Sequence, residues 1–278
     1  MGYNSIMSVL PEADLDKSAL SAAIEISRQA DAHLDVLAMG LDRTPTAHLY
    51  AGANALIQQD ARNDAVKSAS DIAKASKERL RAEGIRWAVD EGVVHLPLLN
   101  RYVAGRARFA DLVIMPQPYG AGKGAEYEAI CESALFDARV PLLVCPQEFA
   151  KIDARRIVIG WNESPEALAA IRAALPVLKA AELVSIAVID PPVHSADRSD
   201  PGGPLSKMLA RHGVTTQISV LSKSMPRISD VLMRHMSDID AGLMVMGAYG
   251  HSRFREAILG GATRDMLQNI EKPVLFSH

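Results

Sequence analysis

The sequence predicts an α/β protein built from two tandem copies of a five-stranded parallel-sheet domain of the Rossmann-like class. Short apolar runs rich in Val, Ile and Leu alternate with longer segments of helical periodicity. The run Leu112–Met115 is apolar at every position, as expected for a central parallel strand that is covered on both faces. The same order of elements then starts again after the middle of the chain. Alternating strands and helices imply right-handed crossovers and a parallel sheet.

The first half contains five predicted strands separated by helices. Gly84 follows the longest helical segment and is expected to end it, and Pro and Gly residues fill the loop after the fourth strand. The predicted strands are 6–10, 33–39, 85–94, 111–115 and 140–145, and the predicted helices are 16–30, 55–82, 95–109 and 126–138.

The second half repeats this order, which indicates a tandem duplication. Residues 241–246 match 110–115 closely, and residues 272–275 match 140–143 approximately. The predicted strands of this half are 157–161, 183–188, 241–247 and 272–276, and a helix is expected over 165–178. The join lies near 146–154. We therefore expect one domain over residues 1–148 and a second over 149–278.

Composition argues against several functional classes. A formal net charge of −3 and an aromatic content of 5% give neither the basic surface nor the stacking platforms of a nucleic-acid partner. The two cysteines, Cys131 and Cys145, form no ligand cluster and suit a reducing cytoplasm. No apolar run reaches membrane-spanning length, and no secretory leader is apparent, so a cytoplasmic location without membrane contact is expected. The histidines show no close metal-ligand spacing, and no metal site is predicted.

A glycine-rich loop follows the strand that ends at Gly247. Its glycines are spaced Gly247-x2-Gly250-x9-Gly260, and a predicted helix begins near Ala262. Free backbone N–H groups and a helix N-terminus favour anions, so a phosphate group is the expected ligand. The alternative is that these glycines only allow tight turns that pack helix on sheet.

This spacing, with the GHSR and LGG segments and the final Pro-Val-Leu strand, resembles the nucleotide-binding loop of the universal stress protein family. The resemblance covers essentially the whole chain as a tandem member. It implies an adenine-nucleotide hydrolase-like fold, bound ATP with or without Mg²⁺, and two halves that pair through their last strands as a pseudo-dimer. Whether two chains pair further is left open. The implied binding residues are Gly160, Trp161, Asn162, Val188, Met246, Gly247, Gly250, His251, Ser252, Gly260, Gly261, Ala262 and Thr263.

The sequence departs from the family pattern at two of these positions. Gly261 stands where ATP-binding members carry Ser or Thr, and Thr263, two residues on, is the nearest candidate for a replacement hydroxyl. Asn162 stands where many relatives carry Asp; either Asn162 or Ser164 is instead a candidate cap of the following helix. In the first half the glycine pair is replaced by a helix with Glu128 and Glu132, so we expect that half to be a degenerate copy that binds no nucleotide, or that binds another ligand.

The resulting hypothesis is a stress-response protein that binds an adenine nucleotide in its second domain and acts through signalling or partner binding. No Walker motif, paired metal carboxylates or nucleophile elbow is present, so no catalytic residue is assigned and hydrolysis is expected to be slow at most. The alternative hypothesis is a nucleotide-free interaction module that acts through dimerisation.

Overall fold

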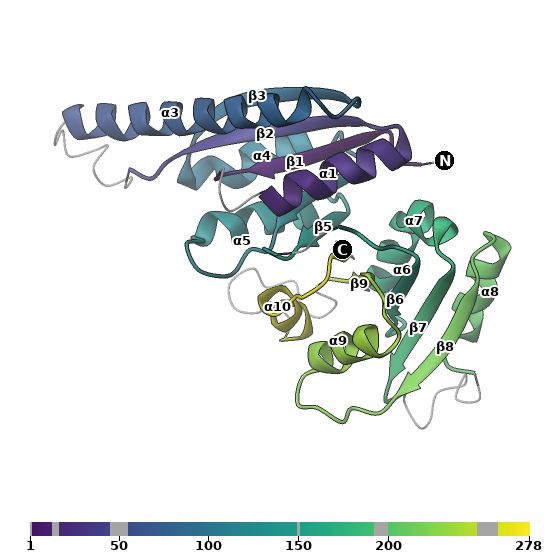
Figure 1. Ribbon diagram of the computed structural model, residues 1–278. Coiled ribbons are helices and arrows are strands. Elements are labelled where there is room, and N and C mark those ends of the chain that lie inside the picture. The colour runs from purple at the N-terminus through teal and green to yellow at the C-terminus, as the bar shows by residue number, and fades with distance from the viewer. Residues whose placement is uncertain (1, 13–16, 45–54, 149–150, 192–199, 249–260) are drawn as a thin grey trace. The chain divides into compact units, whose positions relative to one another are not determined.

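The computed structural model describes residues 2–12, 17–44, 55–148, 151–191, 200–248 and 261–278 (Figure 1). They form two compact units, residues 2–140 and 141–278. Each unit is a parallel α/β arrangement of the predicted kind. No helix among the described residues is long and apolar enough to cross a membrane.

The first unit contains four parallel strands in the order β3-β2-β1-β4. Their bounds are β1 Ser5–Leu10, β2 His33–Asp42, β3 Arg86–His95 and β4 Leu112–Pro116. Asp111 fastens the N-terminal ends of β1 and β4, because its carboxylate accepts hydrogen bonds from the backbone N–H groups of Asn4 and Ser5 at 2.7 and 3.0 Å.

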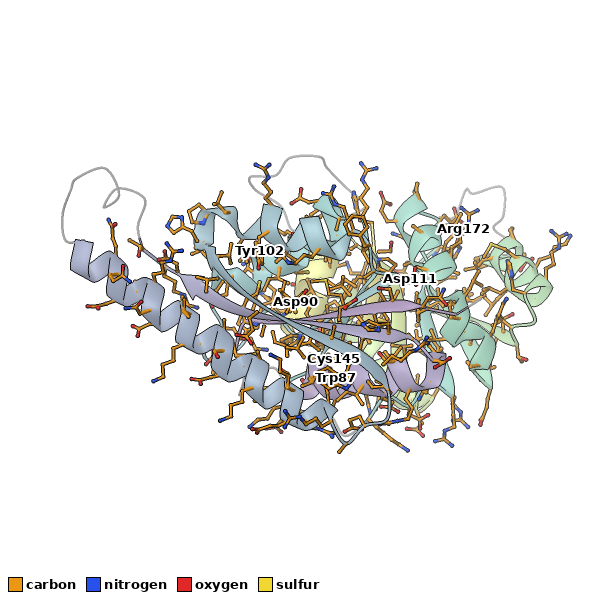
Figure 2. The ribbon with its side chains drawn as sticks, turned by 90° about the horizontal axis from the view of Figure 1, so that it is seen from above. Trp87, Asp90, Tyr102, Asp111, Cys145 and Arg172 are labelled. Atoms are coloured by element: carbon orange, nitrogen blue, oxygen red, sulfur yellow. The ribbon has the colours of Figure 1, made fainter. Side chains whose placement is uncertain are left out.

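Helices cover both faces of this sheet. They are α1 Lys17–Ala30, α3 Ala55–Leu80, α4 Leu99–Ala107 and α5 Ala125–Glu132; the short 3₁₀ helix η1 Leu96–Leu98 precedes α4, and the π-helical turn η2 Ser133–Asp137 follows α5. Figure 2 shows α1 and α3 on one face and α4 on the other. The core consists of the apolar strand side chains and the inward faces of these helices, as the helical periodicity predicted.

The second unit has five parallel strands in the order β10-β9-β6-β7-β8. Strand β5, Leu142–Cys145, is the last strand of the first repeat, and it pairs antiparallel with β10, with Val144 opposite Val274. The bounds of the parallel strands are β6 Arg156–Gly160, β7 Leu183–Ile189, β8 Thr216–Leu221, β9 Leu243–Gly247 and β10 Val274–Ser277.

The helices of this unit are α6 Pro165–Ala173, α7 Leu175–Ala180, α8 Gly203–Arg211, α9 Ile228–Asp238 and α10 Gly261–Gln268. The single helix predicted over 165–178 is wrong, because the chain breaks at Ala174 and α7 starts again with Pro176 in its first turn. A proline inside a helix removes one hydrogen bond and clashes with the preceding turn, so it favours a new helix start.

Both cysteines are buried free thiols. Cys145, labelled in Figure 2, is fully buried, and burial raises the pKa of its thiol well above the usual range. A thiol that resists ionisation is a poor nucleophile.

Candidate functional site

The candidate site lies at the carboxyl edge of the second unit, where the winding of the sheet reverses. Strands β6 and β9 are neighbours there although they are not consecutive, and Gly160 stands opposite Met246 in their register. Open parallel sheets bind ligands in the crevice at such a switch point. Gly160, Trp161, Met246 and Gly247 are therefore brought to one edge, as predicted.

Helix α10 points its N-terminus toward the same edge. Strands β9 and β10 are parallel, so the helix that connects them runs back across the sheet and begins at the carboxyl end of β9. The first backbone N–H groups of an α-helix have no partner within the helix. The described part of α10 begins with Gly261, Ala262 and Thr263, and no acidic residue lies in this first turn.

Gly261 is exposed, and a Cβ atom built on it would meet nothing within 4 Å. Thr263, in contrast, is only 5% exposed. The exposed start of α10 therefore offers main-chain donors, and its geometry favours these over the Thr263 hydroxyl as contacts for an anion. Gly250, His251, Ser252 and Gly260 lie outside the described residues, and their assignment stays a prediction.

Gly247 is required by packing. A Cβ atom at this position would lie 2.4 Å from the backbone nitrogen of Ala167 and 2.7 Å from the carbonyl carbon of Glu166, both in the first turn of α6. Only a glycine lets the end of β9 approach that helix so closely. Gly247 therefore serves the tight packing of helix on sheet that was the alternative to ligand binding. This role holds whether or not a ligand also binds nearby.

The residues after β6 form a turn that starts α6. The Trp161 N–H extends the sheet by donating to the Ala187 carbonyl at 3.0 Å. The side chain of Asn162 is exposed and accepts from the Ser164 N–H at 3.2 Å, and Ser164 caps the helix by accepting from the Ala167 N–H at 3.1 Å. The capping role is thus confirmed for Ser164, while Asn162 supports the same turn from its exposed position.

Val188 and Met246 form part of the apolar floor beneath this edge. They are 6% and 7% exposed. A methyl group of Val188 lies 3.6 Å from the position of a Cβ built on Gly202, at the start of α8. Their side chains are therefore used in packing, and direct contact with a ligand would fall mainly to the backbone beside them.

A polar network inside this unit was missed by the sequence analysis. The Ser185 hydroxyl of β7 lies 2.9 Å from the Ser219 hydroxyl of β8 and 2.8 Å from Nε2 of His235 in α9. Burial lowers the pKa of His235, so the ring stays neutral near pH 7. The only signal in the sequence was a serine inside an apolar strand, which does not identify its partners.

The corresponding corner of the first unit is filled by its own side chains. The Lys123 ammonium donates to the Gln117 carbonyl at 2.5 Å and lies 5.3 Å from the centre of the Tyr127 ring. Glu126, in the first turn of α5, is 4% exposed and forms an ion pair with Arg43. The carboxylate buried here is Glu126, whereas the sequence had pointed to Glu128 and Glu132, which are only partly buried.

Metal-binding clusters are absent from the part of the chain that the structure describes: no group of three His, Cys, Asp or Glu side chains could hold an ion.

Comparison with known proteins gives one consistent family. The model of the Universal stress protein family matches residues 154–278. A universal stress protein of Synechocystis is 26% identical over 144 residues, which are 49% of this chain and 46% of that protein, so the chain spans about half the length of this curated relative.

Solved structures show the same fold over the whole chain. A universal stress protein from Archaeoglobus fulgidus aligns with a TM-score of 0.72 and 15% identity, covering 99% of this chain and 96% of its own. A protein of unknown function from Pseudomonas aeruginosa aligns with a TM-score of 0.63 and 17% identity, covering 99% and 92%. At these identities the likeness concerns the fold alone.

Proposed function

We propose that residues 154–278, which match the model of the Universal stress protein family, bind ATP or a related adenine nucleotide. The nucleotide would lie at the carboxyl edge between β6 and β9, with its phosphates at the start of α10. Binding would change the protein's interactions in a stress response, and hydrolysis would be slow at most. The cytoplasm is the compartment that we expect for this activity.

The observation that carries the proposal is the start of the described part of α10 at the switch point of the sheet, where Gly261 is exposed and no acidic residue lies in the first turn. Its N–H groups and the helix dipole attract negative charge, and no acidic residue in that turn opposes a phosphate. Among the described residues, no atom outside the helix and its chain neighbours lies within 4 Å of where a Cβ on Gly261 would be. This corner falls within the family-matched residues.

The described residues provide binding groups and no catalytic apparatus. Mg²⁺ would arrive bound to the phosphates, since the described residues offer no cluster of carboxylates or imidazoles to hold it. The backbone of Gly160, Trp161 and Val188 and the exposed Asn162 amide line the strand ends where a base or ribose would lie. Binding and signalling therefore suit the residues better than phosphoryl transfer, which needs strong stabilisation of the transition state.

A charge placed on Gly261 tests this proposal. In a titration of the whole protein with ATP and Mg²⁺, the wild type should show a saturable rise in its unfolding temperature; ligand at one hundred times Kd stabilises by about 2.7 kcal/mol. Gly261→Asp should weaken binding about tenfold or more, because a carboxylate then competes with the phosphate for the same N–H groups.

Gly261→Asn is the matched control, since it adds a side chain of the same size without the charge. It should bind ATP more tightly than Gly261→Asp does. Equal affinity in both variants and in the wild type would place the nucleotide elsewhere, and no ATP-dependent stabilisation of the wild type would refute nucleotide binding.

A second candidate function is an interaction module that needs no nucleotide. The antiparallel pair of β5 and β10 favours it, because the last strands of the two repeats already pair within one chain, as in an intramolecular pseudo-dimer. In this case the protein would act through dimerisation of whole chains. Sedimentation velocity at increasing protein concentration, with and without ATP, separates the two functions: ATP-independent dimers support the second.

A further inference from the structure

The carboxylate of Glu126 is buried at the N-terminus of α5. The residue is 4% exposed, and a Cβ atom built on Gly124 would lie 2.3 Å from its Oε2 atom. The side chain is thus folded back over the residue that precedes the helix. Gly124 has no side chain with which to cap α5. Glu126 therefore supplies the negative charge that the N-terminus of this helix favours.

Arg43 provides the opposite charge from the carboxyl end of β2. Its guanidinium contacts Oε1 of Glu126, and its side chain is 62% exposed. The backbone on either side is fixed: the Thr44 N–H donates to the Asp42 carboxylate at 2.9 Å, and the Thr44 carbonyl lies 2.7 Å from Nε2 of His95. Arg43 is thus held at the same edge as the start of α5.

A guanidinium beside a helix N-terminus is a receptor for an oxyanion. In this unit the receptor already holds a carboxylate from its own chain. We propose that Glu126 is an internal anion that fills the phosphate position of the first unit, and that it limits the chain to one anion-binding half. The restriction to one anion-binding half rests on the proposed function of the second unit. The assignment of Glu126 as an internal anion does not.

Pyrophosphate is the probe for this proposal. Calorimetric titration of the full chain would be made in the Gly261→Asp background, which disfavours anions at α10. There, Glu126→Ala and Glu126→Gln should each bind pyrophosphate at least about tenfold more tightly than the parent, since charge-assisted contacts of this kind are worth more than the 1.4 kcal/mol of a tenfold change. Adding Arg43→Ala should abolish the gain.

Glu128→Ala is the matched control. It removes the same charge from the same turn of α5 but leaves the buried carboxylate in place. No gain in folded Glu126→Ala and Glu126→Gln proteins would overturn the proposal, and so would an equal gain in Glu128→Ala. Because the titration reports on the first unit, it can succeed even if ATP does not bind to the second.

Discussion

The two helices that precede the final strands, α5 and α10, differ in the charged residues of their first turns. Helix α5 starts with Glu126 and Glu128 in its first turn, and Glu126 is buried against Arg43. The described part of α10 starts with the exposed Gly261 and has no acidic residue in its first turn. Both helices direct the positive end of the helix dipole toward the carboxyl edge of their sheet. Under the two proposals above, the side chains of one helical turn determine which anion occupies the corner.

The strands beside these helices differ in a second way. Strand β9 ends at Gly247, and the repeat aligns this position with Pro116 at the end of β4. In the second unit the close approach of β9 to α6 depends on that glycine. The corner of the second unit therefore depends on the close packing of β9 against α6 as well as on the charges at the start of α10. The two contributions can be tested separately.

The largest effect is expected from Gly247→Ala. The added methyl group would overlap the backbone of Ala167 and Glu166, which cannot move without shifting α6. Overpacking against backbone should cost about 3 kcal/mol of unfolding free energy. Urea denaturation followed by circular dichroism measures it. Gly261→Ala is the control and should be neutral or slightly stabilising, since its Cβ meets open space; equal stability of the two variants would contradict the packing role.

The next effect concerns the polar network that distinguishes the sheet of the second unit. Ser185 aligns with Val36 of the first unit, which is buried in the core. Ser185→Val would make the two units alike but would leave Nε2 of His235 without its partner, at a cost of about 2 kcal/mol. The double variant Ser185→Val/His235→Leu should recover much of this loss, because the imidazole is then removed with its partner and the remaining Ser219 hydroxyl is only partly buried. Chemical denaturation of both variants tests the coupling.

Part of this comparison could be predicted from the sequence. The apolar runs determine the strands because each must be buried between helices, and the repeat shows up in the sequence because both halves bury the same positions. The pairs Arg43–Glu126 and Ser185–His235 could not be predicted, since 83 and 50 residues separate their members. Only the folded chain brings such groups together. The break at Pro176 was visible as a residue type, but neighbouring alanines and leucines made one long helix the simpler interpretation.

A smaller effect is expected from the protonation of His235. Its pKa in the folded protein is lowered by burial, so the unfolded chain takes up a proton first as the pH falls below about 6.5. Stability should be fully present above this pH and decrease as the pH falls toward the lowered folded pKa. Urea denaturation between pH 7.5 and about 5 measures the slope. The variant His235→Gln should lose this part of the dependence; an unchanged slope would assign it to other groups.

The smallest effect on stability is expected from Asn162→Ala, and this variant also tests whether the Asn162 amide contacts the nucleotide. The exposed amide supports the turn before α6 through one hydrogen bond to the Ser164 N–H, so its loss should change the unfolding free energy by about 0.5 kcal/mol or less. Ser164→Ala, which removes the cap itself, should cost about 1 kcal/mol. Titration with ATP then separates the two roles of Asn162. If the amide contacts the nucleotide, Asn162→Ala weakens ATP binding while Ser164→Ala does not. If both variants bind ATP as the wild type does, Asn162 serves only the turn, and recognition at this corner rests on the backbone and on the start of α10.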